Sequence, residues 1–106
     1  MPKYLLRASY TQAGAQGLIK DGGSKRLEVI RAAAASVGGS VEAAYWAFGE
    51  DDFVGIFDLP GNAEAAAVSL TVSASGAVGT KTTVLMTAAD VDAAVKLHPS
   101  YRPPGA

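Results

Sequence analysis

Apolar and polar residues alternate in four short segments of the chain, which predicts four β-strands. The segments cover residues 3–10, 41–48, 52–59 and 80–86, and each contains aromatic or β-branched side chains. Only residues 49–51 separate the second segment from the third. We therefore expect these two strands to pair as an antiparallel hairpin.

Between these segments apolar residues recur at helical spacing and predict two longer helices, over residues 25–37 and 63–75. Two shorter helices are expected over residues 12–20 and 88–97. A side-chain oxygen at the N-cap position of a helix accepts a hydrogen bond from a free backbone N–H of the first turn. The residues expected at these four positions are Thr11, Ser24, Asn62 and Thr87.

The predicted elements follow the order β-α-β-β-α-β and end with a short C-terminal helix. This order is the ferredoxin-like pattern, in which a four-stranded antiparallel sheet carries both long helices on one face. A chain of 106 residues has room for one such domain with one core. We therefore predict a single α+β domain over residues 1–98 and a Pro-rich tail over residues 99–106.

The sheet face opposite the helices needs a partner in this prediction. Aliphatic side chains alternate with aromatic ones in the second and third strands, and we assign the aliphatic set to the helix-covered face. The open face then carries Leu5, Arg7, Trp46, Phe48, Phe53 and Phe57. Exposed apolar patches mark interfaces or ligand grooves, so we expect sheet-to-sheet homodimerisation into a dimeric α/β barrel. The reverse assignment, with the aromatic face in the core, stays open.

Composition and charge exclude several classes of protein. Hydrophobic residues make up 49% of the chain and charged residues 18%, which excludes a disordered chain. The net charge of −1 and the absence of like-charged runs argue against a nucleic-acid or membrane partner. The chain has no cysteine, no apolar run of about 20 residues and no signal-peptide pattern. We therefore expect a cytoplasmic protein without disulfides, thiolate catalysis or iron–sulfur clusters.

Four carboxylates crowd the predicted hairpin and raise the question of a metal or acid–base site: Glu50, Asp51, Asp52 and Asp58. A calcium loop spaces its ligands at alternate positions around a glycine and closes with a bidentate Glu, and that pattern is absent. Asp58 lies at the far end of the third strand, about 20 Å from the turn at ~3.3 Å per residue. We therefore expect polar turn residues, with neither a metal nor a cofactor; weak cation binding and catalysis are less favoured alternatives.

His98 is the only histidine, and a lone histidine can serve as a general base or a metal ligand. It follows the last predicted helix, where favourable contact with the helix C-terminus is the simpler explanation. No motif for a Ser–His–Asp triad or a phosphate loop is present. The candidates for ligand binding or for the interface are Arg7, Tyr45, Trp46, Asp52, Phe53, Phe57 and His98.

Five short motifs are spread over most of the chain. They are KYLL at residues 3–6, YT at 10–11, SKRL at 24–27, GG at 38–39 and GEDDFV at 49–54. Together they resemble the GYD-domain family, small bacterial and archaeal proteins with a ferredoxin-like, dimeric α/β-barrel fold. The family is named for a Gly-x-Tyr-Asp signature, which Gly49 and Asp52 match, whereas Asp51 stands at the tyrosine position. The resemblance implies the fold and a homodimer, and it implies no particular activity.

Two functions stay open on the sequence. The first is a homo-oligomeric module that binds a small apolar ligand or serves assembly. The second is a small cofactor-independent enzyme that acts on a hydrophobic molecule, similar to the monooxygenases among dimeric α/β barrels. Arg7, Tyr45, Asp52 or His98 would then supply polar groups. An enzyme should hold a closed pocket of about 300 Å³ or more with converging polar groups, whereas an assembly module should not.

Overall fold

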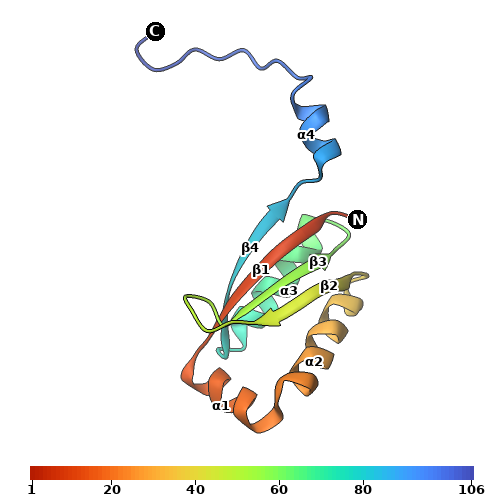
Figure 1. Cartoon of the computed structure of the whole chain (residues 1–106), viewed down its shortest axis with the longest axis vertical. Helices are drawn as coiled ribbons and strands as arrows, with labels where there is room; N and C mark the ends of the chain where they lie inside the picture. The colour runs from red at the N-terminus through yellow and green to blue at the C-terminus, as the bar shows by residue number, and fades with distance from the viewer.

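The computed structural model describes residues 1–106 and contains one four-stranded antiparallel sheet with four helices (Figure 1). In chain order the elements are β1 (Lys3–Tyr10), α1 (Gln12–Asp21), α2 (Gly23–Ser36), β2 (Ser40–Trp46), β3 (Phe53–Asp58), α3 (Asn62–Ala74), β4 (Val78–Leu85) and α4 (Ala88–Ala94). The strands lie in the order β2-β3-β1-β4, and every neighbouring pair is antiparallel. The predicted α+β, ferredoxin-like fold is therefore confirmed.

The four predicted strands are all present, although some of their ends differ from the prediction. β2 ends at Trp46, two residues early, because the Ala47 N–H donates to the carbonyl of Asp52 at 2.8 Å and the chain turns there. β4 begins two residues early, at Val78, because this residue pairs with Tyr10 of β1. A local turn thus decides where β2 stops, whereas pairing with a segment far away in the sequence decides where β4 starts.

Two of the expected helix caps are confirmed. Thr11 Oγ1 accepts a hydrogen bond from the Gly14 N–H at 3.2 Å, and α1 begins directly after it. Thr87 and Asp90 form a reciprocal capping box at the start of α4, with hydrogen bonds of 2.9 and 3.1 Å. Both threonines satisfy backbone N–H groups that the first helical turn leaves free.

The other two expected caps are wrong. Ser24 lies inside α2, which begins at Gly23 after a left-handed Gly22 with φ 79°. Asn62 is the first residue of α3, and its Oδ1 accepts a hydrogen bond from the Tyr4 hydroxyl at 2.7 Å. A glycine reverses the chain before α2, and a tertiary contact engages the asparagine. The preference of Ser and Asn for N-cap positions predicts neither the glycine turn nor the tertiary hydrogen bond.

The hydrophobic core fills the layer between the sheet and the helices α2 and α3. It contains Tyr4, Leu6, Ala8, Ala34, Phe53, Phe57, Leu59, Ala65 and Val78. The register places Phe53 opposite Ala8 and Phe57 opposite Tyr4. The aromatic residues of β3 therefore share the buried face of β1, and their burial is a main source of stability.

The assignment of the aromatic set to the open face is therefore wrong, and the reverse assignment is confirmed. Phe53 and Phe57 are only 4% and 2% exposed, and the Trp46 ring packs edge-on against Phe53 with centroids 5.4 Å apart. Gly55 lies between the two phenylalanines, where a Cβ would come within 2.7 Å of the Phe57 ring. Phe48 lies in the β2–β3 connection, outside the sheet. Alternation shows which residues share a face, but not which face the helices cover.

No helix covers the other face of the sheet, which is turned toward the viewer in Figure 1 with α3 behind it. The register places Leu5 beside Ile56, and Val54 between Arg7 and Tyr45. Leu5, Val54 and Ile56 are half-buried by their neighbours, whereas Arg7 and Tyr45 are exposed. We call these five residues the open-face cluster. Its aliphatic centre keeps this face a candidate interface.

The last part of the chain, α4 and residues 95–106, projects away from the sheet as an arm (Figure 1). The Cα radius of gyration is 17.0 Å, against about 13 Å for a compact chain of this length. α4 ends at Ala94, three residues earlier than predicted. Val91 and Val95 are exposed on the arm, so this segment adds nothing to the hydrophobic core.

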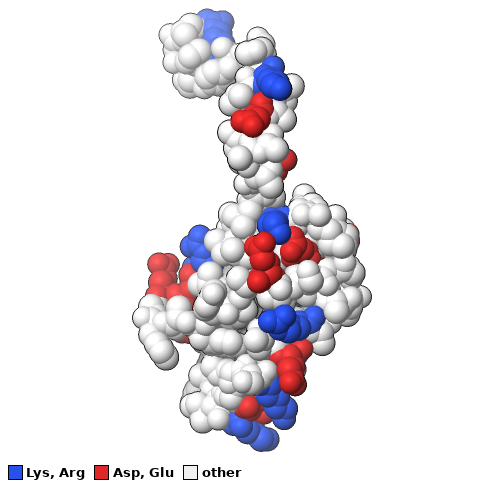
Figure 2. All heavy atoms as spheres, turned by 45° about the vertical axis from the view of Figure 1, so that its right-hand side comes forward, with Lys and Arg blue, Asp and Glu red and all other residues white.

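Charges of both signs are mixed over the molecular surface. On the face seen in Figure 2, basic and acidic side chains are interspersed, and neither sign forms an extended patch. This agrees with the near-neutral net charge of −1. None of the helices combines the length and the apolar character that crossing a membrane requires.

Candidate functional site

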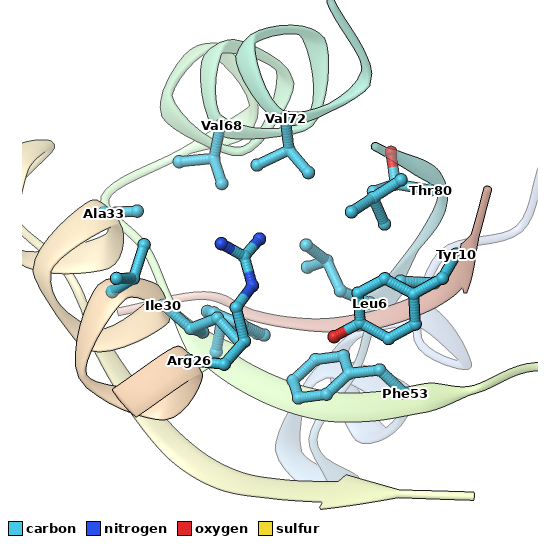
Figure 3. Close-up of a pocket in the computed structure, with 13 residues that line it drawn as sticks. Leu6, Tyr10, Arg26, Ile30, Ala33, Phe53, Val68, Val72 and Thr80 are labelled. Carbon is cyan, nitrogen blue, oxygen red and sulfur yellow. The ribbon is translucent and has the colours of Figure 1, made fainter. Parts of the chain in front are cut away.

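An apolar cavity of about 80 Å³ lies between the sheet and the helices α2 and α3 (Figure 3). β1 and β3 supply its floor with Leu6 and Phe53, α2 supplies Ile30, and α3 supplies Val68 and Val72. Of the 13 lining residues, 11 are hydrophobic. The cavity therefore suits the apolar part of a ligand better than it suits water.

The cavity stays open because α2 and α3 present small side chains to each other. α2 contains four consecutive alanines at residues 32–35, and α3 contains three at residues 65–67. Ala33 and Ala67 line a neighbouring cavity of about 110 Å³, together with Val68. Such short side chains do not reach across the gap, so part of the apolar sheet surface stays accessible.

Arg26 is the only charged residue that lines the cavity. It lies near the start of α2 and is half-buried, and Figure 3 shows its guanidinium projecting over the apolar floor. The guanidinium forms no salt bridge, whereas Lys3, Lys25 and Lys81 each pair with a carboxylate. The cavity therefore combines apolar walls with an unpaired positive charge.

Tyr10, at the end of β1, adds a hydroxyl to the same cavity. Trp46 Nε1 donates to this hydroxyl at 3.1 Å, which leaves the tyrosine proton free for another acceptor. In Figure 3 the hydroxyl points toward the side of the cavity where Arg26 lies. Thr80 also lines the cavity, but its hydroxyl already shares a hydrogen bond of 2.6 Å with Ser69. Two free donor groups, the guanidinium and the phenol, therefore face this space.

The acidic stretch lies outside the cavity and holds the β2–β3 connection in place. Asp52 Oδ2 accepts a hydrogen bond from the Tyr10 N–H at 2.8 Å. Lys81 Nζ lies 3.6 Å from Asp51 Oδ1 and 3.8 Å from Glu50 Oε1. No three side chains of the kinds that bind metals lie close enough together to hold an ion. These contacts are those of a structural turn.

Lys3 joins two carboxylates at the opposite end of the sheet. Its Nζ lies 2.7 Å from Asp58 Oδ1 and 2.9 Å from Glu42 Oε1. The hydrogen bond to Asp58, followed by that to Glu42, raises the pKa of Lys3 above its usual 10.5. Asp58 thus lies away from the acidic turn, as its position in the sequence predicts, and belongs to a surface ion-pair network.

A wider groove of about 840 Å³ lies between the start of β1, the end of β4 and the start of α4. Its polar side chains already bind within the chain: Lys3 holds Glu42, Asn62 accepts from Tyr4, and Asp90 caps α4. A ligand in this groove would have to compete with those contacts. The groove therefore lacks the free, converging polar groups of a built site.

Four of the predicted candidates gather at or beside the cavity. Phe53 and Phe57 line it. Trp46 donates to the Tyr10 hydroxyl, and Asp52 accepts from the Tyr10 backbone. The sequence therefore identified several residues of this region, although it placed the aromatic ones on the opposite face.

The other predicted candidates lie elsewhere, and one important residue was not predicted. Arg7 and Tyr45 belong to the open-face cluster, and His98 lies on the arm. Arg26 was missed, although it precedes Ile30 by four residues and so shares the apolar side of α2. That spacing is the signal by which the sequence could have identified it.

One known family matches the chain over most of its length. The family model described as the GYD domain matches residues 4–95, which include all of the four strands except Lys3 and reach the end of α4. No curated protein and no solved structure matches the chain.

Proposed function

Because the chain belongs to the GYD domain family, we propose that it is a homo-oligomeric module that binds a small, mainly apolar ligand between its sheet and its helices. The observation that carries this proposal is the cavity with its apolar walls and the unpaired guanidinium of Arg26. Ligand sites combine mostly apolar walls with a few placed polar groups, and this cavity follows that pattern. Family membership by itself names no ligand.

Binding accounts for the cavity better than catalysis does. The volume of about 80 Å³ is below the ~300 Å³ at which typical small-molecule sites begin, which limits the occupant to a small molecule whatever its fate. General acid–base catalysis needs a suitable titratable group within reach of the substrate. His98 lies on the arm, and Asp52 is held by the Tyr10 backbone. The free polar groups at the cavity are hydrogen-bond donors, which suits holding a ligand.

The open-face cluster supports the oligomeric part of the proposal. Its aliphatic members lie on a face without helices, and covering that face with a second sheet removes apolar surface from water. A two-fold axis would bring the same cluster of each copy together and form a dimeric α/β barrel. The expected interface therefore keeps Leu5 and exchanges the aromatic residues for Val54 and Ile56.

Native mass spectrometry of protein purified without added ligand tests both parts of the proposal. We expect the mass of a dimer that carries a discrete small-molecule adduct. Ala33→Leu should fill the cavity and abolish the adduct, whereas Ala35→Leu, on the exposed side of the same helix, should keep it. An adduct retained equally by both variants would place the ligand elsewhere. A bare dimer would favour assembly without a ligand, and a monomer would refute the oligomeric part.

A further inference from the structure

We propose that the cavity selects a short aliphatic monocarboxylate, which places its carboxylate on Arg26 and Tyr10 and its chain against the apolar wall. This inference rests on the proposed function, because it specifies the ligand of the same cavity. Three properties of the cavity point to this class of molecule: its charge, its free hydrogen-bond donors and its volume.

The charge of the cavity comes from Arg26. Asp21 lines an adjoining small cavity together with Arg26, but Asp21 pairs with Lys25 at 3.7 Å and forms no salt bridge with Arg26. A half-buried guanidinium has lost part of its hydration, so an anion that replaces the lost contacts is favoured. The planar guanidinium can bind both oxygens of a carboxylate or two of a phosphate. The apolar wall favours the carboxylate, because it has fewer polar oxygens to desolvate than a phosphate and is bonded directly to its hydrocarbon chain.

The remaining groups at the cavity strengthen the preference for an anion. The Tyr10 hydroxyl accepts from Trp46 and keeps its proton for an acceptor. Arg26 lies near the N-terminus of α2, the positive end of the helix dipole. The Thr80 hydroxyl, a possible acceptor, is engaged with Ser69. A neutral alcohol would leave the guanidinium without a counter-ion, and an amine would be repelled by it.

The volume of about 80 Å³ limits the apolar part of the ligand. An engineered cavity of about 150 Å³ holds benzene, so this smaller space suits a short aliphatic chain better than an aromatic ring. Leu6, Ile30 and Val72 make aliphatic walls. A short branched chain therefore fits best, and isovalerate is a suitable probe.

Titration of the isotope-labelled full chain, followed by amide NMR shifts, tests this inference with isovalerate and with its neutral amide, isovaleramide. The two probes share a shape and differ in the charge of the head group. We expect isovalerate to bind at least about tenfold more tightly, with shifts centred on the cavity residues Ile30, Val68 and Val72. Arg26→Gln should bring the two affinities together. Arg31→Gln, on the same helix but exposed and away from the cavity, should keep the preference.

The inference and the proposed function fail in different ways. Equal binding of isovaleramide and isovalerate at the cavity would overturn the carboxylate inference and leave the cavity as a binding site. An Arg26→Gln variant that keeps the preference would overturn the role of Arg26. If neither probe shifts the cavity residues, the inference is overturned, and a protein purified without any adduct would then remove the ligand-binding part of the proposed function as well. The comparison of the two probes on the unmodified chain does not depend on the folding of a variant.

Discussion

Both faces of the sheet carry apolar side chains, yet only one of them is packed. On the helix-covered face Tyr4, Phe53 and Phe57 are buried in the core. On the open face Leu5 and Ile56 alternate with them along the same strands and are only half-buried. The two faces differ mainly because helices cover one of them and not the other, and less because of their hydrophobicity. A period of two in the sequence defines two sets of side chains, and the helices decide which set becomes the core.

Truncation of one residue on each face tests this comparison most directly. Phe57→Ala removes a ring from the core and should lower the free energy of unfolding by about 3–5 kcal/mol. Ile56→Ala should cost about 1 kcal/mol, because a half-buried side chain loses only part of the ~1.5–3 kcal/mol of full burial. Urea denaturation at concentrations that keep the chain monomeric measures both values. Equal costs would contradict the difference between the faces.

A charge placed on the open face sharpens the comparison at the level of assembly. Ile56→Glu would bury an unpaired carboxylate in the sheet-to-sheet interface and should weaken the dimer by about a hundredfold or more. Leu70→Glu replaces a leucine on α3 that is 71% exposed and should leave the dimer intact. Sedimentation velocity over a series of protein concentrations distinguishes the two outcomes. If both variants dimerise like the unmodified chain, the open face is not the interface.

The smallest expected effect concerns the charged end of the open face, where Lys3 binds Asp58 and Glu42. These contacts raise the pKa of Lys3 in the folded chain, so their stabilisation is fully present below the unfolded value of about 10.5. It is lost as the pH rises through the higher folded-state pKa. Lys3→Met should remove this loss and change little at neutral pH, because surface ion pairs contribute little. An unchanged decline of the unfolding free energy at alkaline pH in the variant would assign it to other groups.

The candidate site was only partly predictable from the sequence. Phe53 and Phe57 were predicted as ligand-binding or interface residues, and both line the cavity. They do so from the helix-covered face, which was expected to carry the aliphatic side chains. Arg26 has the appearance of a surface cation in the helix pattern. The Arg26 side chain lies over an apolar cavity only because α3 packs opposite α2 in the folded chain.

The sequence by itself determined the β-α-β-β-α-β order and the starts of α1 and α4 after Thr11 and Thr87. Strand alternation, helical spacing and N-capping involve residues that are close along the chain, so the local sequence pattern predicts these features. Only the tertiary structure decided which sheet face is buried, that Asn62 binds Tyr4, and that Arg26 stands unpaired beside a cavity. These features depend on how the side-chain volumes of distant segments fit together, and no local pattern contains that fit.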